Sequence, residues 1–274
     1  MSECTHDCST CSSKCEKADF QQPLNVNSSV ANVIAVASGK GGVGKSLVTS
    51  LLACESVARG NKVAVMDADI TGPSIPKAFG LHEQAVGTEL GIEPAVAENG
   101  VKVMSINLIL DDEEKPVVWR GPVISGVINQ FWTDVNWGDV DYMFVDMPPG
   151  TGDVPLTVYQ SLPVKGIVVV TTPQDLVTLI VKKAYNMAQM MDVPILGVIE
   201  NMSYVECPDC GKKLEIFGKG KAEAIAKELG VPVLATLPIN PATAELVDAG
   251  KVFEADRAGF ETALDIIEQQ LIKE

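Results

Sequence analysis

Short apolar runs rich in valine and isoleucine recur along most of this chain, and they constrain its fold more than any other feature. Runs without polar alternation are typical of strands covered on both faces, and longer helix-like stretches separate them. This β-α-β rhythm predicts an α/β fold with a doubly wound, mostly parallel sheet flanked by helices. The predicted strands are 33–38, 62–67, 101–106, 142–147, 166–172, 194–200 and 231–237. The predicted helices lie near 44–59, 122–136, 153–162, 174–191, 219–229 and 240–249.

The first 30 residues differ from the rest because they are polar, rich in cysteine and without a periodic apolar pattern. We therefore expect 1–30 to be a flexible tail and linker and 31–274 to be one folded domain. Within that domain, 80–100 is weakly patterned and forms either a hairpin or a loop. The apolar stripe of a final helix, 260–271, is expected to pack on the sheet. Cys54 lies among apolar residues and is expected to be a small buried side chain.

The chain carries 21 basic and 36 acidic residues, which gives a net charge of −15. Binding to nucleic acid or to an anionic membrane needs a basic surface, so neither partner is expected. No apolar run approaches the roughly 18 residues of a membrane span, and the polar start lacks the apolar core of a signal peptide. A cytoplasmic location is the expectation.

A glycine-rich segment, SGKGGVGKS at 38–46, follows the first predicted strand, and two nucleotide motifs fit it. Gly39, Gly41 and Gly44 match G-x-G-x-x-G, and Asp67 ends the next strand, as in dinucleotide-binding folds. The same segment also matches the phosphate loop G-x-x-x-x-G-K-[ST], in which backbone N–H groups surround the β and γ phosphates.

Only the phosphate-loop interpretation explains the two residues that end the motif. Lys45 would supply a cation to the phosphates, and the hydroxyl of Ser46 would bind Mg²⁺. Asp146 ends a later apolar run, where a carboxylate would hold the water shell of the Mg²⁺. The sequence therefore predicts a P-loop fold that binds ATP and Mg²⁺. The predicted nucleotide-binding loop consists of Gly39, Lys40, Gly41, Gly42, Val43, Gly44, Lys45 and Ser46.

Two further residues are candidates for catalysis beside Lys45. Lys40 gives the loop a second lysine, and the alternative is an ordinary solvated side chain. Asp69 follows a strand end near the expected γ-phosphate, where a carboxylate can orient an attacking water. The alternative for Asp69 is a cap of the following turn.

Cys207 and Cys210 form a C-x-x-C pair that offers two thiolates to a metal. A tetrahedral zinc site or an iron–sulfur cube requires four ligands, so one chain is two short. A symmetric dimer would bring two pairs together on its two-fold axis. The alternatives are half of a zinc ribbon and a redox disulfide, although the acidic neighbours Glu206 and Asp209 do not favour the low thiol pKa of a redox pair. The spacing does not distinguish zinc from iron–sulfur.

A second set of cysteines lies in the tail and differs because one chain supplies four thiols. This set can close a metal site alone, hold zinc with the help of His6, or remain without a ligand. The set consists of Cys4, Cys8, Cys11 and Cys15.

Several longer strings resemble a known family. GKGGVGKS resembles the deviant Walker A group that includes MinD, ParA and the nitrogenase iron protein. MDADITGPSIP, WRGP, DMPPGTGD, IENMSYVECPDCG and LPINP resemble the Mrp/ApbC family of iron–sulfur cluster carrier ATPases, in the same order along the chain. The resemblance extends from about residue 33 to the end.

The resemblance implies a homodimeric, slow ATP hydrolase that carries a cluster and transfers it to apo iron–sulfur proteins. It favours a [4Fe–4S] cluster between the Cys207 and Cys210 pairs of two subunits. It also implies that Lys40 reaches the nucleotide of the other subunit, and that Asn201 and the segment around Pro238 lie near the adenine.

The sequence departs from the family pattern in three places. Leu47 stands where the family usually has threonine, which removes a hydroxyl near the α-phosphate. Asn240 replaces a frequent aspartate, and the tail cysteines are spaced more tightly than in eukaryotic cytosolic members. Two other functions remain open: a MinD- or ParA-like positioning ATPase, and a zinc-bridged nucleotide-binding adaptor.

Overall fold

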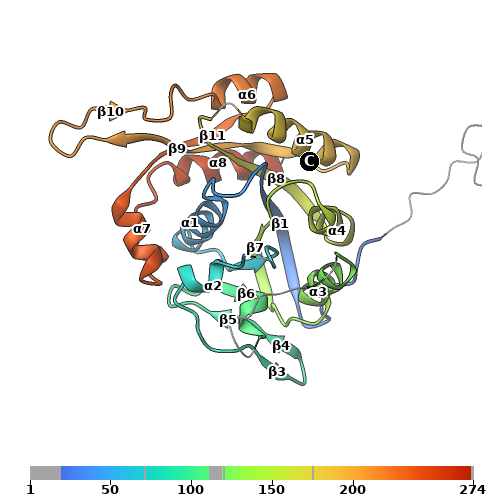
Figure 1. Cartoon of the computed structure of the whole chain (residues 1–274). Coiled ribbons are helices and arrows are strands. Elements are labelled where there is room, and N and C mark those ends of the chain that lie inside the picture. Colours follow the sequence, from blue (N-terminus) through green and yellow to red (C-terminus); the bar gives the residue numbers. More distant parts are fainter. Residues whose placement is uncertain (1–19, 71, 111–118, 120, 175, 273–274) are drawn as a thin grey trace, which may run out of the picture.

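A nine-stranded sheet forms the centre of the protein (Figure 1). The structure is a computed structural model. It describes residues 20–70, 72–110, 119, 121–174 and 176–272, without the side chains of 176–181. The strand order is β10-β9-β8-β1-β7-β2-β6-β5, with β11 also paired to β9. All pairs are parallel except β5 with β6 and β10 with β9. The strands are β1 Ser29–Ser38, β2 Val63–Asp67, β5 Ala95–Val96, β6 Lys102–Met104, β7 Asp139–Asp146, β8 Val164–Thr171, β9 Ile195–Glu206, β10 Lys213–Leu214 and β11 Val233–Pro238.

Helices cover both faces of this sheet, which confirms the predicted doubly wound α/β architecture. One face packs against α1 (Lys45–Ala58), α2 (Ile75–Ala78), α7 (Pro241–Asp248) and α8 (Phe260–Leu271). The other face packs against α3 (Gly121–Thr133), α4 (Asp153–Ser161), α5 (Leu176–Met190) and α6 (Ala222–Leu229). Two short 3₁₀ helices, Ile106–Leu108 and Val252–Glu254, complete the helical elements of the described residues. None of the helices in this part of the chain is both long and apolar enough to cross a membrane.

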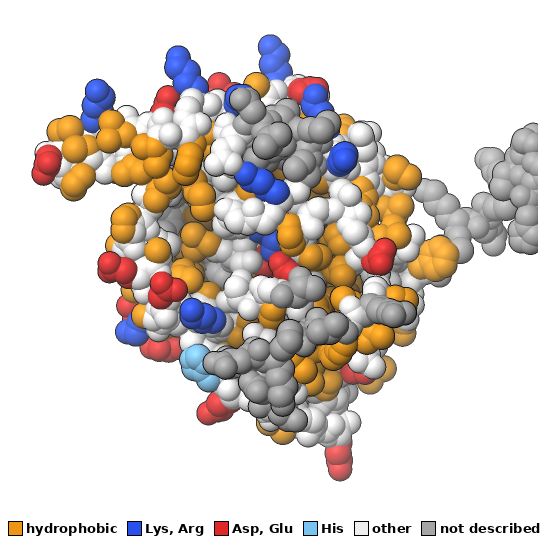
Figure 2. All heavy atoms as spheres, viewed as in Figure 1, with side chains coloured by type: hydrophobic (Ala, Val, Ile, Leu, Met, Phe, Trp, Pro, Cys, Tyr) orange, Lys and Arg blue, Asp and Glu red, His pale blue; other side chains and the backbone are white. Residues whose placement is uncertain are grey.

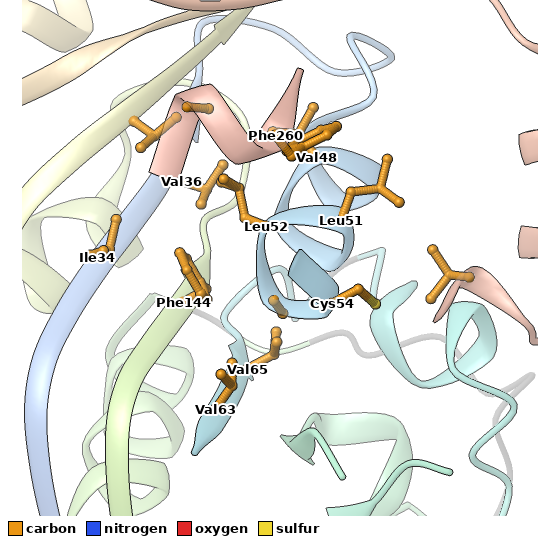
Figure 3. Packing of buried hydrophobic residues seen from close by; sticks show 14 of the residues in the cluster. Ile34, Val36, Val48, Leu51, Leu52, Cys54, Val63, Val65, Phe144 and Phe260 are labelled. Carbon is orange, nitrogen blue, oxygen red and sulfur yellow. The ribbon is translucent and has the colours of Figure 1, made fainter. Parts of the chain in front are cut away.

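The strands of the sheet centre are apolar at every position because successive side chains enter two different cores. Ile34 and Val36 of β1 pack toward α1, together with Phe144 of β7 (Figure 3). The neighbouring Val33 and Ala35 belong to the core on the opposite face. This alternation explains the uninterrupted valine and isoleucine runs from which the sheet was predicted.

The strand β9 is longer than the predicted strand 194–200, and this difference matters for the site. Its inner part pairs with β8 and β11, and its last residues pair with β10 to form a hairpin that projects from the body (Figure 1). The Cys207–Cys210 pair lies at the turn of this hairpin, in the loop between β9 and the two-residue strand β10. A polar, partly exposed strand end lacks the apolar run from which strands are read.

Other sequence predictions agree with the structure, with small shifts at the ends of elements. Within 80–100, β3 (Val86–Thr88) and β4 (Gly91–Glu93) form the hairpin that was one of two predicted alternatives. Cys54 is buried, as predicted, and α8 packs its apolar stripe on the sheet. Residues 20–28, within the predicted linker, lie against the body, where the backbone N–H of Gln22 donates to the Ser161 carbonyl. The division of the chain near residue 30 stays a prediction.

Candidate functional site

The phosphate loop connects the carboxyl end of β1 to the first turn of α1. Gly42 and Gly44 both adopt left-handed φ angles of 78°, and α1 begins at the next residue, Lys45. A Cβ atom at Gly44 would lie 2.2 Å from Nδ2 of Asn201, so both its conformation and its surroundings require glycine. The loop therefore presents backbone N–H groups beside the positive end of α1, which is an arrangement suited to an anion.

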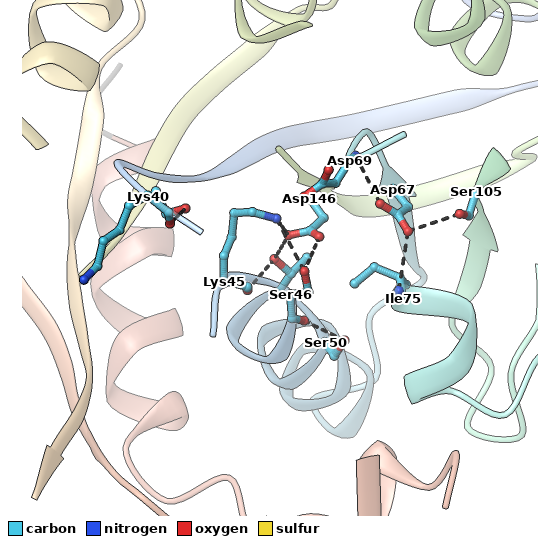
Figure 4. A network of polar contacts seen from close by, with 11 residues as sticks. Lys40, Lys45, Ser46, Ser50, Asp67, Asp69, Ile75, Ser105 and Asp146 are labelled. Atoms are coloured by element: carbon cyan, nitrogen blue, oxygen red, sulfur yellow. Dashed lines mark hydrogen bonds and ion pairs between the residues drawn. The ribbon is translucent and has the colours of Figure 1, made fainter. Parts of the chain in front are cut away.

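Lys45, Ser46 and Asp146 meet directly below the loop (Figure 4). The ammonium of Lys45 lies 2.6 Å from Oδ1 of Asp146, and the hydroxyl of Ser46 donates to Oδ2 at 2.6 Å. Asp146 is fully buried and Lys45 is 6% exposed. A buried carboxylate that faces both a cation and a hydroxyl can exchange these partners for Mg²⁺ when phosphates attract the lysine.

Thr49 and Asp67 belong to the same polar cluster, although sequence reasoning did not assign them to it. The hydroxyl of Thr49 donates to Oδ1 of Asp146 at 2.9 Å. Asp67 is the register partner of Asp146 across the β2–β7 pair, and the hydroxyl of Ser105 donates to its Oδ2 at 3.1 Å. Burial raises the pKa of Asp67 to about 8, and the nearby negative charge of Asp146 adds to this rise.

Two signals in the sequence point to these residues. Thr49 lies four residues after Lys45, so a helix places both side chains on one face. Asp67 and Asp146 each end an apolar run, and the carboxyl ends of parallel strands meet at one edge of a sheet. In the dinucleotide interpretation of the glycine-rich segment, Asp67 is the carboxylate that ends the next strand. The phosphate-loop geometry makes it a second carboxylate near the expected Mg²⁺ site instead.

The raised pKa of Asp67 predicts how stability depends on pH in the nucleotide-free protein. Between its ordinary pKa of 3.8 and about 8, Asp67 keeps a proton in the folded state that the unfolded chain has released. The free energy of unfolding should therefore fall as the pH rises through this range, and Asp67→Asn should remove that part of the fall. Urea unfolding at pH values of about 5 and 9 measures this fall. The fall in the free energy of unfolding should be larger in the wild-type protein than in Asp67→Asn by more than about 1.4 kcal/mol, the equivalent of one pKa unit.

Asp139→Asn is the matched control, because Asp139 is an exposed carboxylate on the same strand as Asp146. This control should keep the pH dependence of the wild-type protein. If the free energy of unfolding of Asp67→Asn depended on pH as in the wild-type protein, Asp67 would be ionised throughout the range.

Lys40 and Asp69 occupy different positions relative to the buried cluster. Lys40 points away from Asp146 (Figure 4), and its ammonium donates to Oε1 of Gln174 at 2.5 Å in the same chain. Asp69 lines a cleft of about 310 Å³ above the phosphate loop, together with Gly72 and the loop residues from Lys40 to Leu47. The structure thus brings Asp69 to the cleft and keeps Lys40 at its rim.

A second cleft adjoins the phosphate loop on the side of β9 and β11. It has a volume of about 440 Å³, and Leu47, Asn201 and Pro238 are among its lining residues. The amide of Asn201 donates to the Val43 carbonyl at 3.0 Å, which ties this cleft to the loop. The two residues predicted near the adenine therefore line one cavity, and its size suits a nucleoside.

A third cleft, of about 520 Å³, lies away from the phosphate loop, around residues 80–86 and 93–96. Glu83 and Glu93 are the acidic groups in its lining, and no lysine or arginine contributes to it. An acidic wall without cations does not suit a polyphosphate. The two clefts that meet at Leu47 suit a nucleotide better than this third cleft does.

The Cys207–Cys210 pair is accessible at the end of the hairpin. Cys210 is exposed and Cys207 is half-buried. Hydrogen bonds from the backbone N–H groups of Asp209 and Cys210 lower the pKa of Cys207, so the expectation from the acidic neighbours is wrong at this thiol. Backbone donors act at hydrogen-bond distance, whereas the carboxylates of an exposed turn are screened by water.

The described residues contain no group of three or more histidine, cysteine, aspartate or glutamate side chains arranged to hold a metal. Cys207 and Cys210 thus remain a pair within one chain. Large apolar side chains are exposed beside them, at Leu214, Ile216 and Phe217, and Figure 2 shows apolar side chains along this projecting part. The four tail cysteines lie outside the described residues.

Named proteins are similar in sequence to this chain over most of its length. An iron–sulfur cluster carrier protein from Clostridium perfringens is 48% identical over 233 residues, which cover 82% of each chain. One from Methanocaldococcus jannaschii is 46% identical over 260 residues, with 91% and 90% covered.

Solved structures agree with the fold described above. A nucleotide-binding protein in complex with ADP from Archaeoglobus fulgidus has a TM-score of 0.77 and 43% identity, and the match covers 85% of this chain and 91% of that one. The cell division ATPase MinD of Pyrococcus furiosus shares the fold, with a TM-score of 0.65, 23% identity and coverage of 88% and 99%. The family model described as NUBPL iron-transfer P-loop NTPase matches residues 29–272, and the chain belongs to this family.

Proposed function

We propose that this protein is an ATP-dependent carrier that holds a [4Fe–4S] cluster between two copies of the chain and transfers it to apo iron–sulfur proteins. One observation carries the proposal: β9 lines the nucleoside cleft and then delivers Cys207 and Cys210 to the end of an exposed hairpin. The names of the relatives from Clostridium perfringens and Methanocaldococcus jannaschii support the same activity.

ATP would occupy the two clefts that meet at Leu47. The β and γ phosphates would lie over the loop from Gly39 to Ser46, and the adenine would lie near Asn201 and Pro238. Lys45 would leave Asp146 for the phosphates, and the freed oxygens of Asp146 would hold Mg²⁺ with Ser46. The missing threonine hydroxyl at Leu47 leaves the α-phosphate with one donor fewer.

Hydrolysis requires a water molecule in line with the γ-phosphorus. Asp69 lines the phosphate cleft and would orient that water, whose oxygen bonds to the γ-phosphorus as the bond to the β,γ-bridging oxygen breaks. The Lys40 side chain points away from Asp146 and donates to Gln174, which supports a role at the nucleotide of a second subunit. Turnover is expected to be slow because the hydrolysis serves to control a cargo.

The cluster is the cargo of the carrier. Two thiolates from each of two chains complete the four ligands that a [4Fe–4S] cluster requires, and a two-fold axis through the cluster relates the pairs. The homodimer and the cytoplasmic location are parts of this proposal. The four tail cysteines, Cys4, Cys8, Cys11 and Cys15, remain candidates for a separate metal site.

Reconstitution and transfer test the function as a whole. The protein is incubated anaerobically with iron, sulfide and a reductant, desalted, and mixed with an apo [4Fe–4S] enzyme whose activity depends on its cluster. We expect the loaded carrier to restore that activity faster than the same amounts of free iron and sulfide in the presence of an iron chelator. Loading with zinc but never with acid-labile sulfide would contradict the proposal and favour the zinc-bridged adaptor.

A further inference from the structure

We infer that Asn201 is a positioning residue that ties the phosphate loop to the strand carrying the cluster thiols, so that bound nucleotide slows the loss of the cargo. This inference rests on the proposed function. It concerns how two sites of one chain affect each other. The argument uses the contacts at three consecutive residues of β9, Glu200 to Met202.

Asn201 holds the phosphate loop directly. Its Nδ2 donates to the carbonyl of Val43 at 3.0 Å, and the Asn201 side chain is 3% exposed. The same Nδ2 atom would lie only 2.2 Å from a Cβ atom at Gly44, so the loop and the strand leave no room for a side chain there. A displacement of the loop by phosphates must therefore be transmitted to Asn201, since a close-packed contact leaves no room for independent movement.

Glu200 anchors the strand on the other side of the same point. Its carboxylate is buried, and Oε1 accepts hydrogen bonds from the N–H groups of Lys221 at 2.7 Å and Ala222 at 2.9 Å. Its Oε2 accepts a bond from the Ser203 hydroxyl at 2.8 Å. These bonds connect β9 to the start of α6, where the chain returns from the hairpin. The base of the hairpin is thus fixed at β9 and at the segment that leads into α6.

Met202 marks the place where the strand can change direction. It has a φ of 57°, and the other non-glycine residue with a positive φ among the described residues is Asp192. A left-handed conformation is unfavourable for a methionine and persists only where surrounding contacts impose it. The strained residue lies directly between the anchored Asn201 and the projecting half of β9.

The projecting half of β9 forms a wall of the nucleoside cleft. Met202, Tyr204 and Glu206 line the cleft, and they alternate along the strand as residues on one face do. Cys207 is the next residue after Glu206. A base in the cleft would pack against this face and restrict the movement of the strand that carries the thiols.

Restricting that strand should favour the cluster. A ligand that orders the hairpin reduces the entropy that cluster binding must otherwise remove, so the two ligands bind with positive cooperativity. The coupling is reciprocal for the binding equilibria: the loaded protein should also bind nucleotide more tightly than the cluster-free protein. Loss of nucleotide after hydrolysis would then loosen the cargo for transfer.

The test compares rates of cluster loss. Full-length protein loaded with the cluster is mixed with an iron chelator, with and without Mg²⁺ and the ATP analogue that has an imido group in the β,γ bridge. The fading of the cluster absorbance gives the rate. We expect the analogue to slow the loss at least about fivefold, which is the lower end of common coupling factors. In Asn201→Ala the ratio of the two rates should fall to about one at saturating analogue.

Asn25→Ala is the matched control, because Asn25 is also a buried asparagine whose amide donates to a backbone carbonyl, that of Leu90 at 3.2 Å. Its ratio should equal that of the wild-type protein. Met202→Gly gives an independent test if Asn201→Ala does not fold, since glycine adopts a positive φ without strain and should uncouple the strand.

The outcomes separate this inference from the proposed function. Equal or faster cluster loss with the analogue in the wild-type protein overturns the inference and leaves the carrier function intact. If the analogue slowed cluster loss in both Asn201→Ala and Met202→Gly as much as in the wild-type protein, the coupling would run through other residues. That result overturns the role of Asn201. A wild-type protein that takes up no cluster overturns both.

Discussion

Replacing Lys45 with alanine is expected to lower the rate of ATP hydrolysis at least about a hundredfold, the usual effect of removing one group that stabilises the transition state. The ammonium of Lys45 is the cation that the structure places below the phosphate loop, 2.6 Å from Asp146. Without it, charge that develops on the phosphates has one partner fewer. Release of inorganic phosphate at saturating Mg-ATP measures the change.

The control for this variant is Lys62→Ala, which removes a lysine that is 63% exposed and paired with Asp139 at the surface. It should hydrolyse ATP at the wild-type rate. Lys45→Ala leaves Asp146 buried without its cation, which costs stability, so its folding must be checked by urea unfolding. Ser46→Ala provides a second test without an unpaired charge, and its hydrolysis should fall at least about tenfold through weaker Mg²⁺ binding. Unchanged turnover in both folded variants would remove the loop from the proposed site.

Cys207→Ala should abolish retention of the cluster by a protein that begins at Gln21 and so lacks the tail cysteines. The parent protein should bind about four irons and four sulfides per dimer, because each chain contributes two of the four ligands. The variant leaves two ligand positions open in each dimer, which exposes iron to water. Counts of iron and acid-labile sulfide after anaerobic reconstitution measure the loss, and both should approach zero.

Cys54→Ala is the matched control, since Cys54 belongs to α1, is 3% exposed in the core and lies far along the chain from the hairpin. Burial raises the pKa of its thiol to about 12, so it is a poor metal ligand at neutral pH. The control should keep the iron and sulfide content of its parent. One zinc and no sulfide per dimer in that parent would instead support the zinc-bridged adaptor.

The sheet was predictable from sequence because the central strands bury side chains on both of their faces. Val33 to Val36 enter two cores in turn, so every position of the strand is apolar and the run is visible without a structure. The outer half of β9 was not predictable in this way. Its residues from Tyr204 to Glu206 pair at the edge of the body, where one face is exposed and polar side chains are tolerated.

In the candidate site, residues of continuous motifs were predictable, whereas contacts between segments far apart in the sequence were not. Lys45 and Ser46 were found because a phosphate loop is a continuous motif, and Asp146 because it ends an apolar run. The contacts of Asp67 with Ser105 and of Asn201 with Val43 join segments that are 38 and 158 residues apart. Such contacts follow from strand order and side-chain direction, which a single sequence does not specify.

The short pairing of β10 with β9 allows the proposed carrier to unfold locally at the hairpin. This strand has two exposed residues, Lys213 and Leu214, which pair only with Glu206 and Val205 among the described residues. A segment with few buried contacts unfolds at a small free-energy cost, whereas the sheet centre opens only with the whole domain. A recipient protein could therefore separate the thiols by melting a few residues at the periphery. The ATPase core would remain intact and ready for another cycle of loading.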